Sequence, residues 1–358
     1  MVKKIKIIIA GGAGFVGSSL ALYLNKKINN SQVYIVDNLI RKGSELNLSR
    51  IENNNIEFIR ADLSNPQSFK SLPKADIFID AASNPSILAG INSSTVDLIN
   101  NNLITTLHSL EWCAENQSKL IFLSSNRIYP FDKLNNINFI EKDTRFSWLE
   151  SLKIKGLSKN GISEELPIEG IRSFYGASKL ASENFIKEYG YFKNLNFVIN
   201  RFGIIGGPWQ MGKFDQGILA YWIAAYIYNF PLKYIGYGGS GKQVRDILHV
   251  NDVCNLIFLQ IMNWEKINFN TYNIGGGYNN SISLFELNSF IQEEIGIKKN
   301  IGKDLNKRDA DIPIYYTDNS KIKEVIDWHP KFSLRETIHD TSKWVYDNKE
   351  LLSIIFLT

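Results

Sequence analysis

The feature that most constrains this chain is a short apolar run that passes directly into a cluster of glycines. The run is Ile5–Ala10, residues 11–17 read Gly-Gly-Ala-Gly-Phe-Val-Gly, and an amphipathic stretch continues through about Lys27. This order predicts a buried strand, a tight turn and a helix. Glycines at positions 11, 14 and 17 permit the turn, a close approach of another group to the backbone and close packing of the helix.

A strand, glycine turn and helix in this order are typical of dinucleotide-binding sites. The pyrophosphate would lie at the helix N-terminus, where free N–H groups and the helix dipole favour anions. Asp37 stands twenty residues after Gly17 (37 − 17), at the end of a second apolar run. A carboxylate there can bind both ribose hydroxyls and would repel a 2′-phosphate, so NAD is favoured over NADP. The alternative is that Asp37-Asn38 only begins a turn.

Further apolar runs alternate with amphipathic stretches over the first part of the chain. They predict strands at 33–36, 56–60, 77–81, 119–124 and 197–202, and helices over about 96–116 and 175–192. This alternation predicts an α/β fold with a Rossmann-type doubly wound parallel sheet. After about residue 204, glycine-rich loops surround one predicted helix at 216–228, which indicates a smaller C-terminal substrate domain.

Composition is that of an ordinary globular protein. The chain has 358 residues, of which 44% are hydrophobic and 21% charged, and this length suits two domains. The formal charge of +4 is spread along the chain, so no basic stripe for nucleic acid is indicated. No apolar run is long enough to span a membrane, and a reducing, cytoplasmic setting is expected.

Cysteine and histidine indicate neither a disulfide framework nor a metal site. Cys113 and Cys254 lie far apart in the sequence, and each is expected to be a small buried hydrophobe. The four histidines lack the spacing of metal ligands. His249, in the string Leu-His-Val-Asn-Asp, is expected to tie a strand to a helix.

A tyrosine and a lysine four residues apart are the clearest sign of chemistry. Tyr175 and Lys179 would share one face of a helix, although such a pair taken alone is most often a surface feature. Tyrosine has an ordinary pKa of about 10, and a nearby ammonium and nicotinamide ring would stabilise the phenolate and lower that pKa. Lys179 could also hold the nicotinamide ribose. Ser124 or Ser125, at a strand end, could supply the hydroxyl that orients a substrate oxygen.

Together these residues resemble the extended short-chain dehydrogenase/reductase family over essentially the whole chain. The resemblance implies Ser125 as the active-site hydroxyl, Tyr175 as the acid–base and Lys179 as its helper. Ser125 is preferred over Ser124 because it stands four residues before Tyr129, as in the family's hydroxyl-x-x-x-Tyr pattern.

The cofactor expected from these features is NAD. Asp62-Leu63 are placed to contact adenine, with a structural cap as the alternative, and small residues at 81–83 would let the cofactor lie close to the backbone. Asn102 matches a helix asparagine of the family that backbone contacts usually hold near the active site. The expected cofactor-binding residues are Gly11, Gly14, Phe15, Val16, Gly17, Asp37, Asn38, Asp62, Leu63, Ala81, Ala82, Ser83, Asn102, Tyr175 and Lys179.

Longer strings resemble one branch of this family, the CDP-paratose 2-epimerases (CDP-tyvelose epimerases). They are residues 82–86, 161–165, 172–175, 206–213, 215–217 and 241–246, and Gly-Pro-Trp-Gln-Met-Gly-Lys is the most specific of them. The resemblance implies an NAD-dependent epimerase that inverts C2 of a CDP-linked (di)deoxyhexose through a transient 2-keto sugar. Much of the branch has threonine where this chain has Ser125, which keeps the hydroxyl but can change the width of the pocket.

The substrate site is expected to combine cations with polar side chains. Arg245 and Arg308 match pyrophosphate arginines of the wider family, and a surface ion pair is the alternative for each. Trp209 and Gln210 could line the sugar or base pocket, with core packing as the alternative for the tryptophan. The expected substrate-binding residues are Asn84, Ser125, Asn126, Arg127, Trp209, Gln210, Lys213, Gln216, Arg245 and Arg308.

The expected domains are an NAD-binding domain over 1–205 and a mainly sugar-nucleotide-binding domain over 206–358. Residues 130–172 lack clear periodicity and are expected to form an inserted loop that borders the sugar. Residues of about 246–262 are expected to return to the first domain. The apolar residues 351–358 could cover a subunit contact or pack on the core.

Other functions are weighed against the epimerase. A 4,6-dehydratase needs an acid pair beside the strand-end hydroxyl, and neither Asn126 nor Arg127 can serve. A 4-epimerase uses the same catalytic residues and is the main rival, and a reductase is a further option. A non-catalytic dinucleotide sensor would commonly lack the tyrosine or the lysine. The resemblance also suggests a homodimer or homotetramer, formed through helices near Val96–Asn116 and Tyr175–Phe192.

Overall fold

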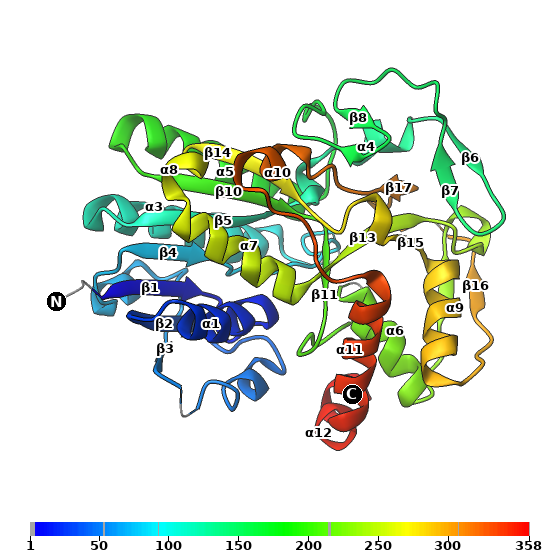
Figure 1. The fold of residues 1–358 in the computed structure, drawn as a ribbon, viewed down its shortest axis with the longest axis horizontal. Coiled ribbons are helices and arrows are strands. Elements are labelled where there is room, and N and C mark those ends of the chain that lie inside the picture. The colour runs from blue at the N-terminus through cyan, green and yellow to red at the C-terminus, as the bar shows by residue number, and fades with distance from the viewer. Residues whose placement is uncertain (1–3, 53, 92, 214–215, 307, 358) are drawn as a thin grey trace.

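The predicted parallel sheet is present in the computed structural model, which describes residues 4–52, 54–91, 93–213, 216–306 and 308–357. Seven parallel strands lie in the order β14-β10-β5-β4-β1-β2-β3 (Figure 1). Their bounds are β1 (Ile5–Ala10), β2 (Ser31–Asp37), β3 (Ile56–Arg60), β4 (Ile77–Asp80), β5 (Lys119–Ser125), β10 (Phe197–Phe202) and β14 (Asn270–Ile274). The Rossmann-type fold class is therefore confirmed.

Helices cover both faces of this sheet, and alternation along β1 shows why. Ile7 and Ile9 belong to a core shared with α1 (Phe15–Lys27) and α7 (Val250–Met262). Ile8 points to the opposite core, which α3 (Thr105–Asn116) and α5 (Phe174–Lys193) complete. Because successive side chains of a strand face opposite sides, a strand buried on both faces must be apolar throughout.

The helix predicted over about 96–116 is divided by a π-helical turn. It consists of α2 (Thr95–Ile99), the π turn Asn100–Ile104 and α3. The extra residue in such a turn reorients the side chains beside it, and π turns occur frequently at functional sites. Asn102 lies in the turn.

The second domain has its own sheet and its own core. Its central sheet consists of β11 (Ile204–Gly206), β13 (Val244–His249), β15 (Ser281–Ser283) and β17 (Ile314–Tyr315). A smaller pair joins β12 (Lys233–Ile235) to β16 (Gly302–Asp304). The helices are α6 (Ile218–Ile227), α9 (Leu284–Ile295), α11 (Leu334–Asp347) and α12 (Lys349–Phe356).

The chain returns to the first domain over a longer stretch than the expected 246–262. Residues 246–249 belong to β13 of the second sheet, and the return begins with α7, which packs on α1. It continues through α8 (Trp264–Ile267) into β14, the edge strand of the large sheet, and α10 (Ser320–Ile326) packs there as well. His249 caps α7 by accepting a hydrogen bond from the Asn251 N–H at 3.0 Å, so it does tie a strand to a helix.

Residues 130–172 contain short elements that dock on the second domain. They form α4 (Phe131–Asn135) and the two-stranded pairs β6 (Phe139–Glu141) with β7 (Phe146–Trp148) and β8 (Leu157–Ser158) with β9 (Gly161–Ile162). Arg145 forms an ion pair of 2.7 Å with Glu286 on α9, and Thr144 donates to the same carboxylate at 2.6 Å. This segment therefore packs on the second domain.

The apolar C-terminus packs on the second core. Leu352 of α12 is buried, Ile355 and Phe356 pack against the same cluster, and the rings of Phe356 and Tyr228 lie 5.9 Å apart. Both cysteines are buried, and neither forms a disulfide. Among the described residues, no helix combines the length and apolar character needed to cross a bilayer.

Candidate active site

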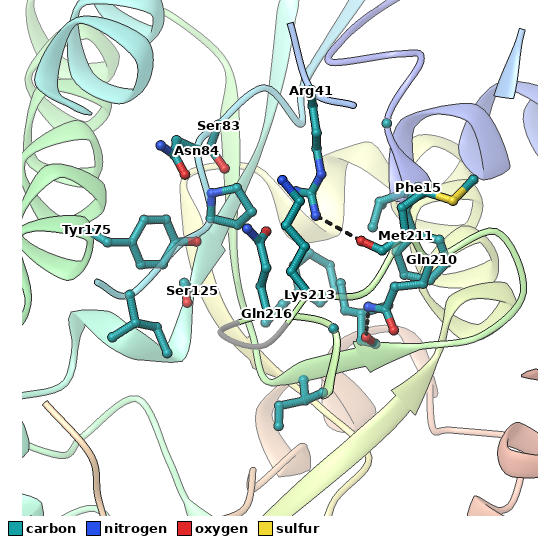
Figure 2. A pocket seen from close by; sticks show the side chains of 18 of the residues that line it. Phe15, Arg41, Ser83, Asn84, Ser125, Tyr175, Gln210, Met211, Lys213 and Gln216 are labelled. Atoms are coloured by element: carbon teal, nitrogen blue, oxygen red, sulfur yellow. Dashed lines mark hydrogen bonds between the residues drawn. The ribbon is translucent and has the colours of Figure 1, made fainter. Parts of the chain in front are cut away.

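A cavity of about 750 Å³ lies where the carboxyl ends of β1, β2, β4 and β5 face the second domain (Figure 2). Parallel α/β sheets bind ligands at this edge. Most of the predicted site residues line it. They are Gly11, Gly14, Phe15, Val16, Gly17, Asp37, Asn38, Asp62, Leu63, Ala81, Ala82, Ser83, Asn84, Ser125, Asn126, Arg127, Tyr175, Gln210, Lys213, Gln216, Arg245 and Arg308.

The glycine turn forms one end of this cavity. Gly11 has a φ of +69°, and a Cβ on it would lie 2.8 Å from the Ala81 carbonyl oxygen. A Cβ on Gly17 would lie 2.2 Å from the Gly11 carbonyl oxygen. Gly14 begins α1 and provides no side-chain cap, so the first N–H groups of the helix face the cavity end without a competing side chain. The turn therefore has the shape and the donors to hold an anion.

Asp37 lies at the end of β2 beside this turn. Its carboxylate accepts hydrogen bonds from the N–H groups of Ala13 at 3.1 Å and Leu39 at 2.8 Å. Burial raises the pKa of Asp37, and these two hydrogen bonds oppose the rise. The bond from Leu39 starts a turn, as the alternative interpretation required, but the carboxylate also faces the cavity.

Asp62 also serves both interpretations. It lines the cavity, and its Oδ1 accepts hydrogen bonds from the Ser64 N–H at 2.9 Å and the Ser64 hydroxyl at 2.8 Å. Burial raises the pKa of Asp62, but the hydrogen bonds from Ser64 and Asn38 together leave it below its ordinary value. The local cap is thus present alongside any contact with a ligand.

The Tyr175 hydroxyl points into the cavity with Ser83 and Ser125 on either side (Figure 2). Burial raises the pKa of Tyr175, whereas hydrogen bonds from the Ser125 and Ser83 hydroxyls and the charge of Arg127 lower it. Ser124, the other candidate hydroxyl, donates to Glu183 at 2.6 Å. This placement favours Ser125 as the hydroxyl available to a ligand.

Lys179 lies one helical turn beyond Tyr175 and does not line the cavity. Its side chain is buried, and its Nζ donates to the Leu123 carbonyl at 2.9 Å. Burial lowers the pKa of Lys179, and the negative charges of Asp80 and Glu183 raise it. Burial leaves the pKa of Tyr175 raised, against the predicted lowering, and the cationic charge that opposes this rise is that of Arg127.

Asn102 also lies behind the wall of the cavity, although it was expected among the cofactor-binding residues. Its Oδ1 accepts from the Asn84 N–H at 2.8 Å, and its Nδ2 donates to the Asn84 carbonyl at 3.3 Å and to the Ser178 hydroxyl at 3.2 Å. Asn102 therefore holds the loop that carries Ser83 and Asn84 instead of facing the cavity itself.

A buried ion pair between β10 and α5 lies behind the cavity wall. The sequence did not indicate it. Arg201 on β10 and Glu183 on α5 are both buried, with N and O atoms 2.7 Å apart. Arg201 also donates to the Tyr129 hydroxyl at 3.1 Å, and Ser124 donates to Glu183. The network joins α5 to β5 and β10. The only sequence signal for it is that Ser124 and Tyr129 lie close to Ser125 along the chain.

The other end of the cavity is rich in cations. Arg245 donates to Asp311 at 2.9 Å and to the Ile312 carbonyl at 2.6 Å, so its ion-pair alternative is present, but within the cavity instead of on an open surface. Arg308, Lys213 and Asp311 line the same region. Asp311 was not predicted from the sequence, because no motif around it distinguishes it from other carboxylates.

Trp209 is absent from the cavity wall. Its ring lies 4.5 Å from the Arg50 guanidinium carbon and 5.7 Å from the Trp344 ring. This placement supports the packing alternative for Trp209. Its neighbour Gln210 does line the cavity and donates to the Ile205 carbonyl at 2.8 Å.

The expectation that residues 130–172 border the sugar is corrected by the structure. None of these residues, all of which the structure describes, lines the cavity. Instead, the wall includes Arg41 and Asn47 from residues 40–47, which no sequence motif had indicated. Arg41 donates to the Met211 carbonyl at 3.3 Å (Figure 2). Asp215, in one of the strings that carry the resemblance, lies outside the described residues.

Comparison with protein families identifies the chain. The model of the NAD dependent epimerase/dehydratase family matches residues 7–275, which is more than half of the sequence. The chain belongs to this family. It resembles the extended short-chain dehydrogenases/reductases, as the motifs predicted, and NAD is its cofactor.

Individual relatives of this epimerase/dehydratase are similar over nearly their whole lengths. The chain is 31% identical over 350 residues to CDP-paratose 2-epimerase of Salmonella typhi, covering 95% of this chain and 98% of the relative. It is 26% identical over 360 residues to UDP-glucuronate 4-epimerase of Thermodesulfobacterium geofontis, covering 97% and 98%. The crystal structure of UDP-glucose 4-epimerase from Thermotoga maritima has a TM-score of 0.78 at 23% identity, covering 96% and 100%.

The residues of this epimerase/dehydratase fit NAD at the glycine end of the cavity. Side chains at Gly11 and Gly17 would fill the space against the backbone, Asp37 is placed for ribose hydroxyls, and the start of α1 faces a phosphate position. When bound, NAD supplies a reversible hydride acceptor for a carbon that bears a hydroxyl.

Proposed function

We propose that this epimerase/dehydratase inverts C2 of a CDP-linked (di)deoxyhexose through a transient 2-keto sugar. The observation that carries the proposal is that Ser125 and Tyr175 line the same cavity as the glycine turn, with no acid pair beside them among the residues that the structure describes. Similarity to a CDP-paratose 2-epimerase over nearly the whole chain supports the choice of C2 and of a CDP-sugar.

The residues divide the chemistry of inversion between them. Tyr175, as phenolate, removes the proton of the C2 hydroxyl and later returns a proton to the 2-keto oxygen. Ser125, whose hydroxyl bonds to Tyr175, orients that oxygen. The keto sugar is planar at C2, so turning it over in the cavity exposes its other face to the returning hydride. The net reaction is redox-neutral.

The cations at the far end of the cavity suit the diphosphate of the substrate. Arg245 and Arg308 present guanidinium groups, whose forked donors match phosphate oxygens. In the proposal, Arg245 keeps Asp311 as a support and offers its remaining edge to the diphosphate. Lys213 and Gln216 line the same cavity (Figure 2).

A panel of sugar nucleotides tests the assignment. The purified enzyme is incubated with CDP-, UDP-, GDP- and dTDP-linked sugars, and the products are identified by NMR. We expect inversion at C2 of a CDP-sugar. In deuterium oxide, C2 should acquire no solvent deuterium, because the hydrogen on carbon travels as hydride. Inversion at C4 would instead assign a 4-epimerase. A purified protein with neither bound NAD nor turnover would favour the alternative of a non-catalytic dinucleotide sensor.

We also propose a dimer formed through α2, α3 and α5. Exposed apolar side chains gather on α2 and α5, including Val96, Phe185, Tyr191 and Phe192. Large exposed apolar residues on neighbouring elements are typical of protein interfaces. Light scattering during gel filtration should give twice the mass of one chain, or four times that mass for a tetramer. Phe192→Glu should shift the measured mass towards that of the monomer.

A further inference from the structure

Residues 40–47, the β2 loop, follow β2 and form part of the cavity wall near the glycine turn. Asn47 is buried, and its Nδ2 donates a hydrogen bond to the Ala13 carbonyl of the turn at 2.9 Å. The loop is therefore fixed to the turn at which the residues fit NAD. Its members on the cavity wall are Ile40, Arg41, Lys42, Ser44 and Asn47.

The β2 loop also contacts the second domain. Arg41 donates to the Met211 carbonyl at 3.3 Å, and Leu46 packs against the second core. Gly43 lies between Arg41 and Leu46 along the chain and is buried with a φ of +91°. A Cβ on Gly43 would lie 2.9 Å from the Met211 Cγ, so a residue without a side chain allows this close approach. The loop is thus packed between the two domains.

Helix α12 contacts the β2 loop at Gly43. A Cβ on Gly43 would lie 3.1 Å from the Ile355 Cδ1. Ile355 packs against the second core, in which Leu352 of the same helix is buried. Ile355 is absent from the cavity wall, whereas Lys42 and Ser44, on either side of Gly43, belong to it. The helix therefore supports the loop from outside the cavity.

These contacts oppose an outward movement of the β2 loop. Such a movement would separate Gly43 from Met211 and Ile355, and it would expose Leu46 to water. Exposure of apolar surface to water is unfavourable. Loops that cover a bound ligand often limit how fast that ligand is released. The contact between α12 and the β2 loop should therefore affect how long NAD stays bound.

We propose that Ile355 of α12 is a positioning residue for the cofactor, which holds the β2 loop against Met211 and so slows the release of NAD. The inference rests on the proposed function only for the reason that retention is needed. In a redox-neutral inversion, the hydride that leaves C2 must return to the same carbon. Reduced cofactor lost between the two half-steps would leave a keto sugar behind. Ile355 contacts neither ligand and acts through the loop.

The direct test is the rate at which bound NAD exchanges. The full-length protein carrying radiolabelled NAD is mixed with excess unlabelled NAD, and the label still bound is measured by rapid gel filtration. Ile355→Ala should speed the exchange by roughly tenfold, the factor that about 1.4 kcal/mol gives. Ile355→Val keeps most of the apolar contact with the loop and should exchange NAD at close to the parental rate.

Matched variants separate this role from a general loss of stability. Ile291→Ala deletes the same atoms from the same core, on α9 and outside the cavity wall. It should lower the free energy of unfolding without speeding the exchange of NAD. Leu351→Ala, at an exposed position of α12, should change neither quantity.

Two results would overturn the inference. One is a parental rate of exchange in folded Ile355→Ala, and the other is an equal acceleration in Ile291→Ala. If Ile355→Ala does not fold, Ile355→Thr provides the same comparison with a β-branched side chain. Because the exchange of NAD needs neither a sugar nor turnover, its result stands even if the proposed reaction at C2 fails.

Discussion

At the scale of single residues, the site depends on the protonation state of one buried phenol. Burial disfavours the phenolate of Tyr175, and the hydroxyls of Ser125 and Ser83 and the charge of Arg127 favour it. Ser125 and Arg127 lie at the end of β5 and Ser83 follows β4, so the balance is set by tertiary contacts with α5. The helix supplies only the tyrosine and, four residues later, the lysine.

Replacing Tyr175 with phenylalanine tests this chemistry. We expect Tyr175→Phe to lower kcat by roughly 10²–10⁴-fold, the usual contribution of a positioned acid–base. The ring still fills the same space, so the fold and the bound NAD should be retained. The matched control is Tyr191→Phe on the same helix, where the hydroxyl is exposed. Near-normal turnover by Tyr175→Phe would contradict the assigned role.

At the scale of secondary-structure elements, α5 is held to the sheet by a buried ion pair. Glu183 forms an ion pair with Arg201 of β10, and the Ser124 hydroxyl of β5 donates to the same carboxylate. A buried charge that loses its partner has no water to replace it. The register of α5 against the strand ends, and therefore the place of Tyr175, depends on this pair.

Removing one member of the pair should be more harmful than removing both. We expect Glu183→Leu to lower the free energy of unfolding by about 3–5 kcal/mol, because it leaves Arg201 buried and unpaired. The double variant Glu183→Leu with Arg201→Met should recover a large part of that loss. Urea denaturation of the NAD-bound protein measures both. Equal losses in the single and double variants would show that the charge itself is not the cause.

At the scale of the whole molecule, the segment with Trp209 and Met211 contacts both domains beside the glycine turn. Trp209 lies between Arg50, which donates to the Ser18 hydroxyl of α1 at 2.9 Å, and Trp344 of α11. Met211, two residues on, accepts from Arg41. Contacts of this kind connect the first domain to the second beside the glycine turn, where we propose that NAD binds.

Loss of the Trp209 ring should weaken the retention of NAD. A cation–π contact and an aromatic pair are each worth about 1 kcal/mol. Because about 1.4 kcal/mol is a tenfold factor, losing both contacts in Trp209→Ala should speed the release of NAD by up to roughly thirtyfold. Trp209→Phe keeps a ring and should stay close to the parent protein. The measurement is the NAD that remains bound after gel filtration. Unchanged retention would limit Trp209 to packing within the second domain.

The sequence alone determined the elements and the cofactor end of the cavity, because both depend on local patterns. Apolar runs such as Ile5–Ala10 and Phe197–Phe202 have the bounds that they predicted. The glycine turn and Asp37 are close in sequence, and a parallel sheet brings its strand ends to one edge. Ser125 and Tyr175, which the sequence proposed as site residues, line the same cavity because the end of β5 and the start of α5 meet there.

Only the tertiary structure decided which of the remaining side chains face the cavity. Trp209, Asn102 and Lys179 lie behind the wall, and residues 130–172 dock elsewhere, because packing between distant segments sets the direction of a side chain. The sequence placed Arg127 among substrate-binding residues by position. The backbone of Arg127 packs against Gly176, although the two residues are far apart along the chain. Charges acting across such contacts are invisible in a linear pattern, since they depend on distance and burial.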